Sequence, residues 1–447
     1  MSALRATLAG AGFGVSRQGA AVLVVAILLG VGTAALPSFS IQVAVLGVAC
    51  LLAVTLALSR LDRTLDGSWV IVAAIYLVGP AGAILLAAGI GLSVVAAIVG
   101  AFLPFAVAAV ILRPAARPRL ALIAPLLLLL VFATASLSWS PDASYGADKL
   151  NVWILAGLIP AIFILALVPA SPTIDWRPIT VAAVLTALAM IAFGVDSPTY
   201  PGRPSLFGAN PIWESRALFI GAIVVLFAPL PRPFKLVLVP LIVYAGILPV
   251  SRGPAIGFLL GICAGGAEKL RTFDRHDRRI QLAWAGIGIT TALGIVAAFG
   301  LFDRVSTILS SFLAEPDVTS RASYITAATQ LFQTHPFLGA GLGAFAATGL
   351  DTYPHNLLFE ILAELGILGV LLVVPWLLFA IRGAAGSPIL MALLVATALF
   401  TLFSGSLASN VEFWLCSALA VARFPLIRRR TASVRRERLR GVAVARG

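Results

Sequence analysis

The chain has 447 residues, of which 60% are hydrophobic and 11% are charged, with a formal net charge of +13 and a mean hydropathy of +1.05. A water-soluble protein carries about 25% charged residues, so this composition excludes a soluble globular protein. The apolar residues form runs of about 17–25 residues, the length that a helix needs to cross the hydrocarbon core. These runs do not alternate apolar and polar residues as the strands of a β-barrel do. We therefore predict an all-α, polytopic integral membrane protein that forms a single membrane domain over residues 1–447.

About fourteen apolar runs predict transmembrane helices. The run over 254–266 is short, and the sequence leaves open whether it forms a half-helix or a hairpin with the run before it. The helix count between residues 236 and 266 is therefore open. In chain order, the predicted helices lie near 19–36, 40–59, 69–88, 91–112, 120–137, 150–169, 178–195, 215–230, 236–250, 254–266, 282–302, 357–381, 388–405 and 411–425.

The distribution of Lys and Arg predicts the orientation of these helices. With a cytoplasmic N-terminus and alternating helices, 25 of the 31 Lys and Arg residues fall on the inner side, in agreement with the positive-inside rule. The basic segment 426–447 then forms a cytoplasmic tail that lies against anionic headgroups or is disordered. Because the basic residues flank the membrane spans, the net charge indicates topology and not nucleic-acid binding. The outer side holds Lys149, Arg203, Arg216, Arg252, Arg304 and Arg321.

Three predicted outer segments carry most of the polar residues. They are Ser138–Lys149, Asp196–Arg216 and the stretch Asp303–Asn356, within which residues 303–354 form a long periplasmic loop. Loops longer than about 15 residues are usually functional or disordered. This loop contains Arg321–Thr334, whose apolar residues recur on one face and predict a short amphipathic helix on or near the membrane.

His355 directly precedes the apolar run at 357–381, after Tyr353 and Pro354. We expect its ring at or near a helix N-terminus, where backbone N–H groups and the helix dipole attract anions. Histidine is also the side chain best suited to general-base catalysis near neutral pH. A base beside an anion site on the outer face predicts a catalytic role for this residue.

Two further patterns need a physical interpretation. The glycines at 339, 341 and 343 superficially resemble a dinucleotide loop, but no predicted strand precedes them, so we expect a tight turn that re-enters the membrane. Glu360 and Glu364 fall one turn apart within a predicted span. An ionised carboxylate there costs roughly 2.5–3.5 kcal/mol. We expect each of them to lie near the membrane surface, to be paired or to be protonated.

The sequence predicts neither a metal site nor a bound cofactor. Cys50, Cys263 and Cys416 lie in three separate apolar stretches, which gives neither a disulfide framework nor a metal-ligand cluster. A carboxylate metal site needs more converging ligands than the outer loops provide.

Several motifs, mainly in the C-terminal half, resemble the O-antigen ligase and Wzy-type polymerase superfamily. The resemblance lies in the order, the spacing and the common outer placement of these motifs. The motifs are Arg203 with Gly208-Ala209-Asn210-Pro211, Ser251-Arg252-Gly253, the segment 321–345 that begins Arg321-Ala322-Ser323-Tyr324, and the segment 355–369 that begins His355-Asn356-Leu357-Leu358.

The resemblance implies a GT-C-type glycosyltransferase of the bacterial inner membrane. Such an enzyme transfers a glycan from undecaprenyl diphosphate to an acceptor sugar hydroxyl on the periplasmic side. It implies that Arg252 and Arg321 bind the diphosphate, since Arg donates bidentate hydrogen bonds and is always charged. It also implies that His355 is the general base or orients the acceptor. Further substrate contacts are expected at Lys149, Arg203, Asn210, Arg216, Asn356 and Glu364.

Two questions stay open at the level of sequence. The acceptor is either lipid A-core, as in a ligase, or a growing glycan, as in a polymerase, and the sugar identity is hidden. The alternative function is a lipid-linked oligosaccharide flippase or another transporter. Transporters tend to show two related halves and polar residues near the membrane midplane, and this sequence shows no matching halves.

Overall fold

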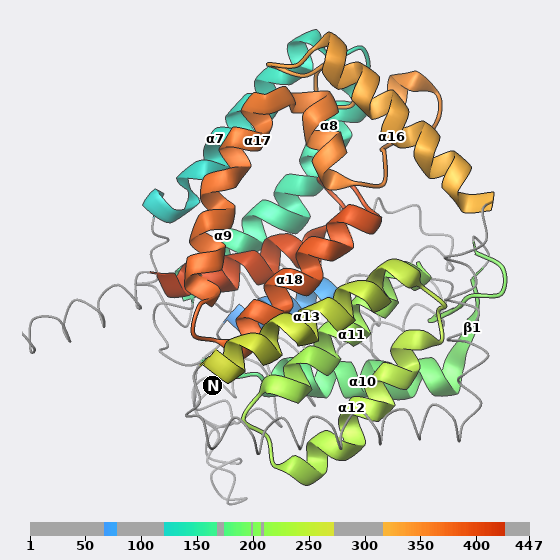
Figure 1. Cartoon of the computed structure of the whole chain (residues 1–447), viewed down its shortest axis with the longest axis vertical. Coiled ribbons are helices and arrows are strands. Elements are labelled where there is room, and N and C mark those ends of the chain that lie inside the picture. Colours follow the sequence, from blue (N-terminus) through green and yellow to red (C-terminus); the bar gives the residue numbers. More distant parts are fainter. Residues whose placement is uncertain are drawn as a thin grey trace, which may run out of the picture. The chain divides into compact units, whose positions relative to one another are not determined.

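The structure, a computed structural model, describes residues 67–77, 120–167, 174–197, 200–206, 210–271 and 316–424 (Figure 1). The spans predicted near 19–36, 40–59, 91–112 and 282–302, most of 69–88 and the basic tail 426–447 lie outside these residues. The chain divides into two compact units, which are described one at a time. The first comprises residues 1–116, 173–258 and 283–315, and the second comprises residues 117–172, 259–282 and 316–447.

The described part of the chain is mainly helical, as predicted. Within it, three helices are long and apolar enough to cross a membrane, at Ala121–Trp139, Ala143–Leu165 and Leu357–Ala384. Shorter apolar helices lie at Arg177–Phe193 and Pro388–Phe403. The prediction of a mainly helical fold is confirmed, and three of these helices have the length and composition of the predicted membrane spans.

The first unit is built from α4 (Gly67–Ile71) with η1 (Val72–Leu77), α10 (Arg177–Phe193), α11 (Pro211–Phe227) and α12 (Arg232–Ile247). Gly221 allows α10 and α11 to approach closely, because a Cβ atom there would lie 2.2 Å from the Cβ of Ala183. The Tyr76 hydroxyl donates to the carbonyl of Ala217 at 2.7 Å. The Ser215 hydroxyl donates to the carbonyl of Gly246 at 2.8 Å. These buried contacts connect η1 and α12 to α11.

A small hairpin in the first unit departs from the all-α prediction. Strand β1 (Gly194–Asp196) pairs antiparallel with β2 (Pro204–Leu206), and Val195 lies opposite Ser205. The hairpin is fastened to α11, because the buried carboxylate of Glu214 accepts the Leu206 N–H at 2.9 and 3.0 Å. The second predicted outer segment is therefore an ordered structure where it is described.

Helix α13 (Arg252–Arg271) is longer than the predicted run at 254–266. It is one continuous helix of 20 residues, so the half-helix, one of the two possibilities that the sequence left open, is excluded. The polar residues Glu268, Lys269 and Arg271 extend its C-terminal end beyond the apolar run. The residues to Phe258 belong to the first unit and those from Leu259 to the second.

The second unit contains the three candidate membrane spans. Helix α7 (Leu120–Ser136) ends in η2 (Leu137–Trp139), and α8 (Ala143–Val152), η3 (Trp153–Leu158) and α9 (Ile159–Leu167) follow as one run of helix. The remaining elements are α16 (Pro316–Thr334), η5 (Ala346–Thr348), α17 (Leu357–Ala384), α18 (Pro388–Phe403) and a helix over residues 411–424.

Tryptophans anchor the core of the second unit. The rings of Trp153 and Trp414 lie 5.6 Å apart, and Trp376 donates to the Ser417 hydroxyl at 2.9 Å. All three indoles are fully buried. Helices α7 and α17 run side by side (Figure 1). The core therefore fixes the helices that pack around α17.

Helix α17 is broken at Gly366, which has φ 63° and ψ −162°. A loop inserts its backbone into the break. The amides of Ala340 and Gly341 donate at 2.9 Å to the carbonyls of Ala363 and Glu364, and the helical amides of residues 367 and 368 donate to loop carbonyls 336 and 337 at 2.9 and 3.2 Å. The groups freed by the break are therefore satisfied, as a low-dielectric environment requires.

Candidate functional site

His355 lies at the junction between the loop and α17. Asn356 is the N-cap of the helix, and its side-chain oxygen accepts from Leu358 N at 3.0 Å and Phe359 N at 3.2 Å. Its side-chain amide donates to the carbonyl of Leu402 at 3.0 Å, which fixes the junction to α18. The prediction that His355 lies at a helix N-terminus is confirmed, and capping gives Asn356 a structural role.

The His355 ring is held by two aromatic rings and one carboxylate. It stacks on Tyr324 with ring centroids 5.6 Å apart and packs against Tyr353 at 4.5 Å. Its Nε2 lies 3.1 Å from Oδ2 of Asp351, and 29% of the side chain remains exposed. His355 has φ 55°, a left-handed conformation that is uncommon for any residue with a side chain. A partly exposed imidazole in a fixed orientation is suited to proton transfer with a bound ligand.

Asp351 is held in turn by its neighbour. Both the backbone N–H and the hydroxyl of Thr352 donate to Oδ1, the hydroxyl at 3.1 Å. Partial burial acts to raise the pKa of Asp351, but the hydrogen bond to His355 and those from Thr352 outweigh it, and the pKa lies below its ordinary value. The carboxylate is therefore charged at neutral pH.

Arg321 lies on the same face of α16 as Tyr324, one helical turn earlier, because residues three apart in a helix are neighbours. Its side chain is exposed. The face continues to Ala328, which is fully buried against Phe345 and Ala363. The packing of α16 thus places Tyr324 against His355, and Arg321 lies one helical turn before Tyr324.

Lys149 was predicted in an outer loop, and the structure corrects that placement. Asp142 caps α8 by accepting the Tyr145 N–H at 3.0 Å, so the helix begins at Ala143 and Lys149 lies within the candidate span 143–165. Only 3% of Lys149 is exposed. A buried lysine in a span needs a partner of opposite charge.

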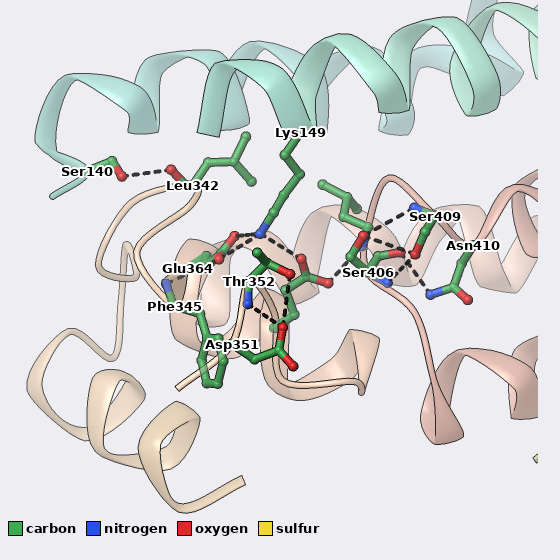
Figure 2. Close-up of polar contacts among 12 residues, drawn as sticks. Ser140, Lys149, Leu342, Phe345, Asp351, Thr352, Glu364, Ser406, Ser409 and Asn410 are labelled. Carbon is green, nitrogen blue, oxygen red and sulfur yellow. Dashed lines mark hydrogen bonds and ion pairs between the residues drawn. The ribbon is translucent and has the colours of Figure 1, made fainter. Parts of the chain in front are cut away.

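The partners of Lys149 are Glu360 and Glu364, the two carboxylates predicted to be paired or protonated. Figure 2 shows the lysine extending from α8 to Glu364, where Nζ lies 2.8 Å from both carboxylate oxygens. It lies 2.8 Å from Glu360 Oε1. The carboxylates also accept backbone N–H groups, Glu364 from Phe345 at 3.3 Å and Glu360 from Leu407 at 2.7 Å. Lys149 and Glu364 thus have their charged and polar partners within the protein, and a bound substrate is not needed to explain why they are buried.

The three glycines at 339, 341 and 343 form the tight turn that the sequence predicts. All have positive φ, between 72° and 99°. A Cβ at Gly339 would lie 2.3 Å from the backbone of Glu364, and one at Gly343 would lie 2.6 Å from the carbonyl oxygen of Asp142. Ser140 and Ser136 fasten the carbonyl and the amide of Leu342 at 2.7 and 3.1 Å. The glycines thus let the loop lie directly on α8 and α17.

The other predicted site residues lie in the first unit. Arg203 packs over the ring of Tyr200 at 5.7 Å, and Asn210 caps α11 by accepting the Ile212 N–H at 3.0 Å. Arg216 was predicted to be an outer-side residue, but it lies inside α11 and is fully buried. Arg252 is the first residue of α13 and is partly exposed. Capping thus explains Asn210, and burial removes Arg216 from the surface.

Sequence reasoning missed three residues that surround the predicted base: Asp351, Tyr324 and Tyr353. One signal was available, because Asp351 precedes His355 by four residues across a proline-containing turn. The position of Tyr324 depends on how α16 packs on α17, which no local pattern contains. Among the described residues, no group of three or more His, Cys, Asp and Glu side chains is arranged to hold a metal ion.

Part of the chain matches a known protein family. Residues 236–374, which include α16, the glycine turn and the break in α17, match the family model described as O-antigen ligase. No curated protein and no solved structure matches the chain significantly. The resemblance to the O-antigen ligase and Wzy superfamily is therefore confirmed through this part of the chain.

Proposed function

We propose that this protein is a membrane glycosyltransferase that transfers a glycan from a polyprenyl diphosphate, undecaprenyl diphosphate in bacteria, to a sugar hydroxyl on the periplasmic side of the inner membrane. The observation that carries the proposal is His355, a partly exposed imidazole held by Asp351 and Tyr324 inside the segment that matches the O-antigen ligases. The family match supports glycosyl transfer in general, and the chemistry of the site supports the finer assignment.

His355 acts as the general base in this proposal. As the acceptor oxygen forms a bond to the anomeric carbon, its proton passes to the imidazole. The bond between that carbon and the diphosphate oxygen breaks, and its electron pair leaves with the polyprenyl diphosphate. Removal of such a base typically slows a reaction about 10²–10⁴-fold.

Arg321 binds the departing diphosphate in this proposal. The leaving group gains negative charge as the bond breaks, and a guanidinium donates two parallel hydrogen bonds to phosphate oxygens. Its exposure and its position one turn before Tyr324 on α16 support this role. Arg252 keeps the same assignment as a prediction of the sequence resemblance.

The acceptor is lipid A-core if the protein is a ligase and a growing glycan if it is a polymerase. The description of the matched family supports the ligase. Both acceptors present a sugar hydroxyl to the same base, so the residues proposed above serve either reaction.

A transporter of lipid-linked oligosaccharides is the second candidate, and one observation favours it. Lys149, Glu360 and Glu364 are charged residues inside candidate spans, where ionisable groups often mark transport pathways. However, these charges pair with one another and with backbone amides. Such mutual satisfaction is typical of a structural cluster.

The deciding experiment uses the purified full chain in nanodiscs with an undecaprenyl-diphosphate-linked glycan and, in separate reactions, lipid A-core or a second lipid-linked glycan as acceptor. We expect glycan transfer without added nucleotide sugar, and its loss in His355→Ala. A strict requirement for a nucleotide sugar, or full activity in His355→Ala, would contradict the proposal. Movement of the lipid-linked glycan across a vesicle membrane without transfer would support the transporter.

A further inference from the structure

We propose that Asp351 is the positioning residue for His355 and that it presents Nδ1, not Nε2, to the acceptor hydroxyl. The inference rests on the proposed function and deepens it, since it names the atom that takes the proton. Its basis is the 3.1 Å contact between Asp351 Oδ2 and His355 Nε2. A carboxylate at one ring nitrogen fixes the tautomer that leaves a lone pair on the other.

The two nitrogens of the His355 ring have different surroundings. Among the described residues, Asp351 is the hydrogen-bond partner of Nε2, and no described group forms a hydrogen bond with Nδ1. Because Asp351 is charged, Nε2 must carry the hydrogen in the neutral ring and donate it. Nδ1 is then the basic atom, and the ring becomes an imidazolium when it accepts the acceptor's proton.

Three contacts keep this arrangement from rotating. Tyr324 stacks on the imidazole with only 26° between the ring planes, and Tyr353 packs against it at 52°. Thr352 donates twice to Asp351, through its backbone N–H and its hydroxyl. The carboxylate is therefore held by its neighbour, and the ring is held by the carboxylate.

The left-handed conformation of His355 supports the same assignment. A side-chain residue at φ 55° is strained unless surrounding contacts hold it there, and such strain concentrates at functional sites. His355 directly precedes the cap residue Asn356 and follows Asp351 by four residues. The turn is thus shaped to bring the carboxylate and the imidazole together.

The test compares Asp351→Asn with wild type, with His355→Ala and with the control Asp148→Asn, which removes an exposed carboxylate on α8. We expect Asp351→Asn to lower kcat roughly 10²–10⁴-fold, while KM for the lipid-linked donor changes less than about threefold. Its pH–rate profile should also differ from that of wild type, because the carboxylate that accepts from Nε2 has gone. Asp351→Glu should restore part of the rate, and Asp148→Asn should retain the wild-type rate.

The double variant Asp351→Asn with His355→Ala separates positioning from structural support. If Asp351 acts through His355, the double variant is no slower than His355→Ala alone. Additive losses, or a wild-type rate and pH profile in Asp351→Asn, would overturn the inference. If Asp351→Asn does not yield folded protein, Asp351→Glu decides: a rate between those of wild type and His355→Ala supports the inference, and a folded variant with the wild-type rate or with the rate of His355→Ala contradicts it. Equal activity of wild type and His355→Ala would instead count against the proposed function itself.

Discussion

Lys149 illustrates how burial changes the meaning of a charged residue. It is buried between two carboxylates in the second unit, and each carboxylate also accepts a hydrogen bond from a backbone N–H. A buried ion pair stabilises a fold little more than well-packed apolar side chains of similar volume would. Removing one partner, however, leaves an uncompensated buried charge. The cluster therefore makes the packing of α8 on α17 sensitive to a single side chain.

We predict that Lys149→Met lowers the stability of the protein by about 3–5 kcal/mol, because it leaves two carboxylates buried without a cation. The measurement is thermal unfolding in detergent, followed by size-exclusion chromatography. Arg177→Met is the matched control, since its ion pair with Asp175 is exposed and contributes about 0–1 kcal/mol. Similar unfolding temperatures for the two variants would show that the buried cluster is not needed for folding.

We predict that Arg321→Lys loses most of the transfer activity and keeps normal abundance. The substitution retains the charge but removes the planar pair of donors that matches a diphosphate. The assay is initial transfer rate at saturating acceptor. Arg382→Lys, an exposed change at the far end of α17, serves as the control. A wild-type rate in Arg321→Lys would reduce that residue to a surface charge.

For individual residues, the sequence predicted the place at the start of a helix better than it predicted contacts with distant parts of the chain. His355 and Asn356 lie where the sequence places them, at the start of α17. Lys149 does not, although Asp142 at its helix start is a recognisable cap signal. Its pairing with Glu364 joins positions 215 residues apart, and no local pattern carries such a contact.

For the helices, the apolar runs predicted well where each helix lies, but they did not predict where a helix is broken. Helices α7, α10 and α18 begin and end within a few residues of the predicted runs, because an apolar run of the required length has few alternatives in lipid. The break at Gly366 was missed, since a single glycine within an apolar helix is ordinarily tolerated. The information for it lies in the preceding loop, where the backbone amides of Ala340 and Gly341 donate to helix carbonyls and loop carbonyls 336 and 337 accept from helix amides.

We predict that Gly339→Ala destabilises the protein by about 2–5 kcal/mol, because it combines a left-handed backbone with a clash against α17. Gly349→Ala is the control that separates the two effects. Gly349 has a similar φ of 71° but no atom within 4 Å of an added Cβ, so we expect a loss of only about 1 kcal/mol. Unfolding temperatures in detergent and expression yield measure both. Equal losses would show that the loop shifts to accommodate the methyl group.

For the molecule as a whole, the charge asymmetry predicts the orientation of the spans in the membrane. A reporter fused after Gly447 should be active on the cytoplasmic side, and one inserted near Asp317, in the predicted periplasmic loop, should be active on the periplasmic side. The measurement pairs a reporter that works only in the cytoplasm with one that works only in the periplasm. Activity of both insertions on one side would contradict the predicted topology and the placement of His355 with it.

The break in α17 also leads to an expectation for biogenesis. Before the preceding loop is in place, a break at Gly366 would leave carbonyls and amides without partners in the bilayer, which costs several kcal/mol for each group. We therefore expect a newly synthesised α17 to enter the lipid as a continuous helix. We expect it to open when the backbone of residues 336–341 takes over those hydrogen bonds. On this expectation, insertion of the span and formation of the site beside it are two successive steps, and the second begins when the loop packs against the helix.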